Sequence, residues 1–318
     1  MLRRRQVGHL TEPAIDDRRI LRALGPPDTL PADPALEAEH SAILVRMCSP
    51  EIVRLAHDGA PRPSRRAMFG LAALAALAAV APAPALAAPR PGAVVDLTHT
   101  LTPQLPVWPG NPPIAMVPVA WHASGGFDQL ALGYWEHTGT HLDAPAHRIP
   151  GGATTEALAV EDLVAPLVVL DISAKAAGDA DAVVTVADID SWRGQHGEIP
   201  ERAFVAMYSG WEHRIAEPST FLGLDAQGRP HAPGFSGEAA HHLVAQCGIV
   251  GAGVDTLSLD CGVDPDFGAH TALLGAGRYG VEMLANLATV PPVGARIVIG
   301  APKHAGGTGG PCRVLALT

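Results

Sequence analysis

Eleven residues near the middle of the chain concentrate side chains that bind divalent metal ions. The run between His137 and His147 is His-Thr-Gly-Thr-His-Leu-Asp-Ala-Pro-Ala-His. A lone histidine is most often an ordinary structural residue, but three imidazoles and one carboxylate in so short a stretch form a donor set for a borderline divalent metal. This density predicts a metal site rather than a loop of unrelated polar residues.

The spacing of these residues predicts that their side chains lie on the same face of the chain. His137, His141 and Asp143 stand at odd positions, so an extended segment would place them on one face. Gly139, between the two histidines, would leave space for an ion. A helix could also bring His137 and His141 together, but the Gly, Thr and Pro residues of the run disfavour a helix. The Glu that follows the first His in helical metalloprotease motifs is also absent.

The same residues predict hydrolytic chemistry. Two imidazoles and one carboxylate leave coordination positions open for water or substrate. A divalent ion held in this way lowers the pKa of bound water to about 7 and polarises a carbonyl group. His147, just beyond Pro145, is then free to transfer protons. A second pair, His270 and Glu282, carries little weight when taken alone.

The elements that must position this motif lie in residues 89–318, which we expect to form a single catalytic domain. Apolar segments predict strands at 93–97, 167–172, 203–207, 249–254 and 296–299, and helical patterns predict helices at 186–193, 236–246 and 280–287. Ser236 is expected to cap its helix, with Glu238 in the first turn. Strands that alternate with short helices predict an α/β or mixed fold.

The charge of this domain excludes one class of partner. Residues 89–318 carry 11 Lys plus Arg and 23 Asp plus Glu. An acidic protein repels a phosphate backbone, so we expect a small-molecule substrate and no nucleic acid. Cys247, Cys261 and Cys312 form no Cys-x-x-Cys pair, which argues against a thiolate zinc ribbon. We expect free thiols, although Cys247 and Cys261 could pair if they were adjacent.

The first 88 residues resemble an export signal more than a folded domain. Residues 1–46 are polar, and we expect them to be disordered or to result from a start assigned too early, with Met47 as the true start. Within residues 47–88, Arg65 and Arg66 precede an apolar Ala/Leu run and a small-residue cleavage site at 83–87. This order predicts a twin-arginine-type signal peptide and a periplasmic or other extracytoplasmic location.

Other interpretations of this region stay open. The apolar run is shorter than the ~20 residues that span a bilayer, so we expect no stable membrane span. An uncleaved anchor and a buried Ala/Leu helix are the alternatives to a cleaved signal. Without export, the protein would be cytoplasmic.

Several motifs together resemble the bacterial cyclase-like hydrolase family, which includes bacterial kynurenine formamidases and isatin hydrolases. Besides the central His/Asp run, they lie at 96–99, 106–110, 251–260, 269–270, 281–284 and 306–313, in the family's order. The resemblance implies a swivelling β/β/α fold and a homodimer or larger assembly. It also implies hydrolysis of an amide-type bond, in an arylformamide or in a cyclic amide such as isatin.

The resemblance implies roles for individual residues as well. The first ligand set would be His137, His141 and Asp143, with Asp143 bridging to a second ion held by His270 and Glu282. Members of the family hold zinc or manganese, and one ion or two. His147 matches the family's catalytic histidine.

The family resemblance specifies the substrate less closely than it specifies the metal ligands. Trp108 resembles a residue that stacks on an aromatic substrate, although a core tryptophan that anchors a turn is the alternative. A long insert between 208 and 234 and the predicted export signal depart from the formamidases, whose kynurenine substrate is cytoplasmic.

Two other functions remain open on the sequence alone. A metal-dependent cyclase or lyase could use the same fold to stabilise an enolate, and an extracytoplasmic protein could bind a metal or ligand without turnover. His147 beside the ligand set favours an enzyme, because metal binding alone needs no proton-transfer group.

Overall fold

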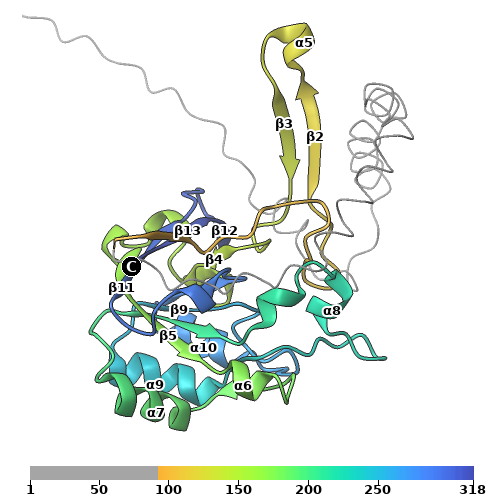
Figure 1. Cartoon of the computed structure of the whole chain (residues 1–318). Helices are drawn as coiled ribbons and strands as arrows, with labels where there is room; N and C mark the ends of the chain where they lie inside the picture. Colours follow the sequence, from red (N-terminus) through yellow and green to blue (C-terminus); the bar gives the residue numbers. More distant parts are fainter. Residues whose placement is uncertain (1–91) are drawn as a thin grey trace, which may run out of the picture. The chain divides into compact units, whose positions relative to one another are not determined.

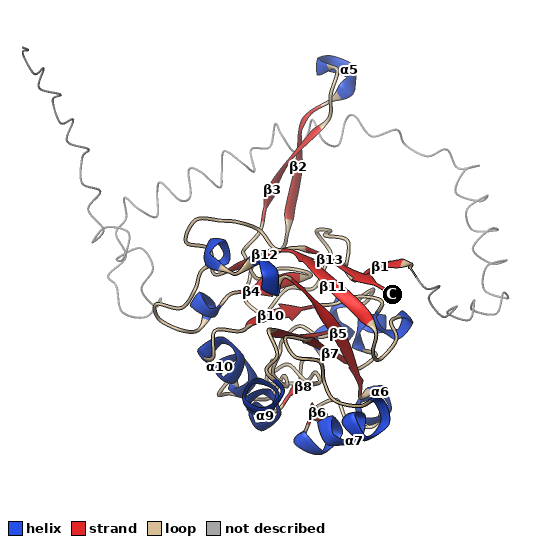
Figure 2. Ribbon diagram, turned by 90° about the vertical axis from the view of Figure 1, so that its left-hand side faces the viewer, coloured by secondary structure: helices blue, strands red, loops and turns tan. Residues whose placement is uncertain are grey.

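The computed structural model describes residues 92–318, which fold around one twisted nine-stranded sheet (Figures 1 and 2). Its strand order is β1-β13-β11-β5-β7-β9-β10-β4-β12. The expected mixed α/β class is therefore confirmed. The segments 1–46 and 47–88, with the predicted export signal, lie outside the described residues.

The strands of this sheet are short. They are β1 (Val94–Asp96), β4 (His141–Asp143), β5 (Val164–Asp171), β7 (Phe204–Tyr208), β9 (Gly251–Val254), β10 (Tyr279–Glu282), β11 (Ala295–Gly300), β12 (Gly309–Pro311) and β13 (Arg313–Leu317). The four central strands β5, β7, β9 and β10 run parallel, and the flanking pairs are antiparallel.

Both faces of the central strands are buried. Along β5, Leu167 and Val169 pack into one apolar core, whereas Val168 and Leu170 pack into the other. A strand that is buried on both faces has a continuous apolar run instead of an alternating pattern. This burial explains why β5, β7 and β9 were predictable from the sequence.

Three helices cover one face of the sheet (Figure 1). They are α7 (Val186–His196), α9 (Gly237–Cys247) and α10 (Gly268–Gly275). The predicted cap of α9 is confirmed, because the Ser236 hydroxyl accepts a bond from the Ala239 amide. Thr185 and Asp188 form a capping box at the start of α7. Such caps satisfy amide groups that have no partner within the helix.

The remaining elements are small. They are β2 (Ala115–Ala120), α5 (His122–Gly125), β3 (Gln129–Gly133), α6 (Ser173–Ala176), β6 (Val183–Val184), α8 (Pro218–Leu222), β8 (Gly234–Phe235) and 3-10 turns at Pro145–His147, Thr155–Ala157, Val160–Asp162, Trp211–Arg214 and Leu287–Thr289. The two strands β2 and β3 form a separate hairpin that stands away from the nine-stranded sheet (Figures 1 and 2).

The predicted helix at 280–287 is wrong. The chain there forms β10, which pairs with β9 on one side and β4 on the other. Met283 and Asn286 then adopt left-handed backbone conformations, with φ of 54° and 58°, which no α-helix accommodates. Apolar residues at helical spacing produced the prediction, and pairing within the sheet overrode it.

Two further expectations are settled for the described residues. Cys247, Cys261 and Cys312 are free thiols. None of the helices between 92 and 318 is both long and apolar enough to cross a membrane.

Candidate metal centre

The central motif lies in the interior of the sheet, where β4 is paired on both edges. In the β4–β10 pairing His141 stands opposite Glu282, and in the β4–β12 pairing Asp143 stands opposite Gly309. The register of β4 therefore brings Glu282 from the end of β10 beside the motif. Helix α10 supplies His270 from one face of the sheet.

The expected extended conformation holds for only part of the motif. His141 and Asp143 share one face of β4, as predicted, but Gly139 has a φ of +63° and His147 ends a 3-10 turn. A Cβ on Gly139 would lie 2.4 Å from Leu101 Cδ2. Gly139 is thus required by its backbone conformation and by packing, and the expectation that it leaves room for an ion is wrong.

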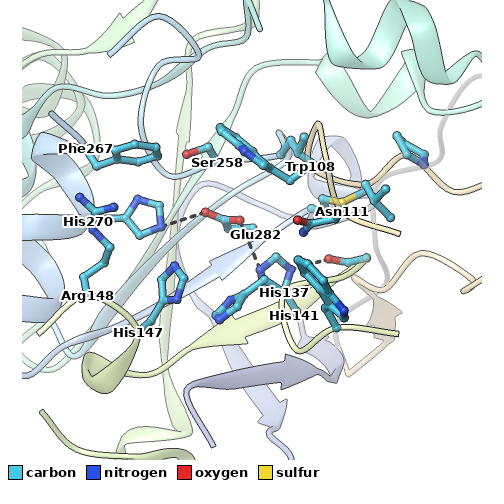
Figure 3. Close-up of a pocket in the computed structure, with 16 residues that line it drawn as sticks. Trp108, Asn111, His137, His141, His147, Arg148, Ser258, Phe267, His270 and Glu282 are labelled. Carbon is cyan, nitrogen blue, oxygen red and sulfur yellow. Dashed lines mark hydrogen bonds and ion pairs between the residues drawn. The ribbon is translucent and has the colours of Figure 1, made fainter. Parts of the chain in front are cut away.

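Asp143 is the residue around which the other donors meet. Its Oδ1 lies 2.6 Å from His137 Nδ1 and 3.3 Å from His141 Nε2, and its Oδ2 lies 3.4 Å from His270 Nε2. Glu282 lies 3.3 Å from both His141 Nε2 and His270 Nε2. The structure therefore brings together all five residues for which we predicted a metal-binding role (Figure 3 labels four of them).

The charges of this cluster fit a divalent cation. Asp143 is fully buried and Glu282 is 6% exposed. Burial opposes protonation of His141, but the carboxylates of Asp143 and Glu282 outweigh it and raise the pKa of His141 to about 10. The cluster thus favours additional positive charge, which a bound ion provides while leaving imidazoles neutral as ligands.

Unpartnered atoms support the same conclusion. His141 Nε2 and Asp143 Oδ2 are buried and have no hydrogen-bond partner in the described part of the chain. Buried polar atoms without partners are costly and uncommon in folded proteins. Both atoms face the other donors, so the residues present fit a metal ion.

Partners outside the donor set orient the histidines. The carboxylate of Asp260 accepts a bond from His270 Nδ1, and the Gly139 carbonyl lies 2.7 Å from His141 Nδ1. Thr308 Oγ1 lies 3.1 Å from His137 Nε2 and is itself bonded to Glu136. Such partners fix which ring nitrogen faces a metal. No role was predicted for Glu136, Asp260 or Thr308, although the last two lie within family motifs.

His147 lies beside this cluster, half-buried. Its ring centroid is 3.8 Å from that of His137 and 5.8 Å from that of His270. Burial lowers the pKa of His147 to about 4, so its imidazole is neutral and can accept a proton near neutral pH. Its donor nitrogen also lies within 4.8 Å of donor atoms of His137 and Asp143, so this geometry permits a role as a ligand too.

A cavity of about 340 Å³ opens over the cluster (Figure 3). This volume lies at the small end of the range for ligand pockets. Trp108, Trp135 and Phe267 give it aromatic walls, and Trp108 and Phe267 have ring centroids 6.1 Å apart. Trp108 also packs against the apolar core around Trp211, so it both lines the cavity and anchors its own turn.

Comparison with known proteins agrees with this geometry. A model of the Cyclase family, described as "Putative cyclase", matches residues 95–261. The chain belongs to the Cyclase family. The resemblance inferred from the sequence motifs is therefore confirmed.

Curated relatives of this Cyclase-family chain are hydrolases by name. Isatin hydrolase from Roseibium aggregatum is 35% identical over 243 residues, which cover 70% of this chain and 91% of that protein. Kynurenine formamidase from Salinibacter ruber is 27% identical over 233 residues, which cover 70% and 96%.

Solved structures give the same family. Isatin hydrolase A from Labrenzia aggregata bound to benzyl benzoate matches with a TM-score of 0.67 and 36% identity, over 71% of this chain and 93% of that one. An isatin hydrolase bound to the product analogue thioisatinate matches with a TM-score of 0.67 and 30% identity, over 80% and 99%.

Proposed function

We propose that this protein is a divalent-metal-dependent hydrolase that cleaves a non-peptide amide-type bond, in a cyclic amide such as isatin or in an arylformamide. The observation that carries the proposal is the convergence of three histidines and two buried carboxylates beside His147, at the base of an aromatic-walled cavity. The similarity to an isatin hydrolase at 35% identity supports the cyclic amide as substrate.

The donors can be divided between two ions. We assign His137, His141 and Asp143 to a first ion, and Asp143, His270 and Glu282 to a second, with zinc or manganese as the metal and one or both positions filled. When bound there, a divalent ion supplies activated water at neutral pH and polarises the carbonyl group to be attacked.

Residues of the chain supply the remaining steps. His147 is neutral and adjacent to the donors, so it can take a proton from the attacking water and pass it to the leaving nitrogen. Trp108 and Phe267 hold a planar substrate against the wall of the cavity.

A panel of substrates tests the reaction class. We expect the metal-loaded protein to open isatin or a related lactam, or to deformylate formanilide, with initial rates measured by chromatography. Chelation of the metal should abolish the reaction. A loaded ion with none of these amides hydrolysed would contradict the proposal and favour a cyclase or lyase, or a protein that binds a metal without turnover.

The hairpin of β2 and β3 is the feature that supports a proposed oligomer. Residues 115–133 contain one Asp and no Glu, Lys or Arg, and Val119, Trp121, Phe127, Leu130 and Leu132 are each about half exposed. An isolated two-stranded hairpin is marginally stable in water, and exposed apolar patches of this kind mark interaction sites. We propose that a second copy of the chain covers the hairpin, because two-fold homodimers are the commonest assemblies.

A hairpin variant tests this assembly. We expect the wild-type protein to be a dimer or larger by light scattering, and a Leu130→Ser/Leu132→Ser variant to shift to the monomer. A Val160→Ser/Val293→Ser variant removes exposed apolar side chains elsewhere and should leave the assembly unchanged. A monomeric wild-type protein would overturn the proposal.

We also propose a swivelling β/β/α fold and export through a twin-arginine signal. The similarity to solved isatin hydrolases supports the fold. The order of Arg65, Arg66, the apolar run and the small residues at 83–87 supports export. A mature N-terminus at Met1 or Met47, measured by mass spectrometry on cytoplasmic protein, would contradict export.

A further inference from the structure

Arg148 follows the catalytic candidate His147 and brings a permanent positive charge to the cavity. Among the cavity-lining residues in the described part of the chain, it carries the only such charge (Figure 3). Two carboxylates, Asp143 and Glu282, lie at the base of the same site. An arginine here serves neither the metal nor proton transfer, because a guanidinium is always protonated and has no lone pair to offer.

Arg148 differs from several other arginines of the described chain. Arg193, Arg202, Arg229 and Arg313 each bond to a nearby carboxylate. The Arg148 side chain forms no ion pair or hydrogen bond with residues 92–318. Its guanidinium carbon instead lies 4.5 Å from the centre of the Phe267 ring. A cation–π contact holds the guanidinium in place and leaves its N–H donors free.

Phe267 is held in an uncommon conformation that supports this contact. Its φ is +51°, in the left-handed region that a bulky aromatic residue rarely occupies. The ring lies between Arg148 and Trp108, and its centroid is 5.8 Å from that of His270. Strained residues concentrate at ligand sites. The strain here is consistent with a ring that both lines the cavity and positions the arginine.

We infer that Arg148 binds a carboxylate carried by the aromatic ring of the substrate, so that the enzyme prefers anionic aromatic amides to neutral ones. The guanidinium fork matches a planar carboxylate in a bidentate manner. With the carboxylate on Arg148 and the ring against Phe267 and Trp108, the amide end of the substrate faces His147. This inference rests on the proposed function and names its substrate class.

Kinetics on two matched substrates test the inference. The substrates are formanilide and 2-(formylamino)benzoate, which differ by one carboxylate. We expect the metal-loaded wild-type enzyme to show a KM about tenfold lower for the anionic one, the size of one charge-assisted contact. Arg148→Gln should bring the two KM values together, and Arg148→Lys should restore part of the difference between them. The same preference in wild type and Arg148→Gln, or none in wild type, would overturn the inference.

Binding without turnover separates this inference from the proposed function. By calorimetry, the metal-loaded wild type should bind 2-aminobenzoate about tenfold more tightly than its neutral isostere 2-aminobenzamide, and Arg148→Gln should bind both alike. Arg214→Gln is the matched control, because Arg214 also lies over an aromatic ring, Trp211, but does not line the cavity. Persistent discrimination in Arg148→Gln would assign the carboxylate to another group. If no amide is hydrolysed but this pattern holds, the proposed function fails and the carboxylate site remains.

Discussion

The His147→Ala protein keeps its metal and loses turnover by about a hundredfold to ten-thousandfold, the range for loss of a general acid–base group. The half-buried imidazole is next to His137 and is neutral at neutral pH, because burial lowers its pKa to about 4. Alanine removes the proton acceptor but leaves five other donors for the ions. Elemental analysis and initial rates, measured on the same preparation, check both parts of the prediction.

The control for this variant is His213→Ala, at an exposed histidine outside the cavity. It should match wild type in metal content and rate. Undiminished turnover in His147→Ala would end the catalytic role of this residue. A parallel loss of metal would instead make His147 a ligand with His137 and Asp143, a grouping that the distances permit.

The Asp143→Asn protein binds no ion tightly and has no measurable turnover. Asp143 is fully buried and, among residues 92–318, it alone lies close to His137, His141 and His270 together. Asparagine keeps the shape of the side chain but removes the charge and turns an amide group towards imidazole nitrogens. We expect metal content, measured after gel filtration, to fall to background.

Asp255→Asn provides the matched control, because Asp255 is equally buried but lies outside the site. It accepts bonds from the Ser209 and Trp211 amides, and burial raises its pKa to about 6. The Asp255→Asn protein should keep the metal content of the wild type, whatever the change in its melting temperature. Full metal occupancy in Asp143→Asn would show that the ions bind elsewhere.

A strand could be predicted from the sequence where burial on both faces requires a continuous run of apolar residues. The central parallel strands β5, β7 and β9 are apolar on both faces and stand out without knowledge of their partners. Strand β4 has three residues, two of them polar, and only its pairing with β10 and β12 makes it a strand. The same pairing explains why the apolar spacing at 280–287 gave a wrong helix.

The site was predictable to the extent that it is local in sequence. His137, His141, Asp143 and His147 lie in one short run, so their density was visible directly. His270 and Glu282 were predicted as metal ligands only through the family resemblance. They are distant in sequence from the central motif, and the register of β10 and the start of α10 place them beside it. Thr308 reaches His137 across 171 positions, and no local pattern reveals such a contact.

The central claim is that metal ions held by this cluster perform the hydrolysis. The most direct measurement is a titration of zinc or manganese into chelator-stripped protein, with isatin hydrolysis followed at each step. We predict no activity in the stripped protein and a rate that rises with each ion bound, reaching its plateau at one or two ions per chain. Full hydrolysis by protein that elemental analysis shows to be metal-free would contradict the account.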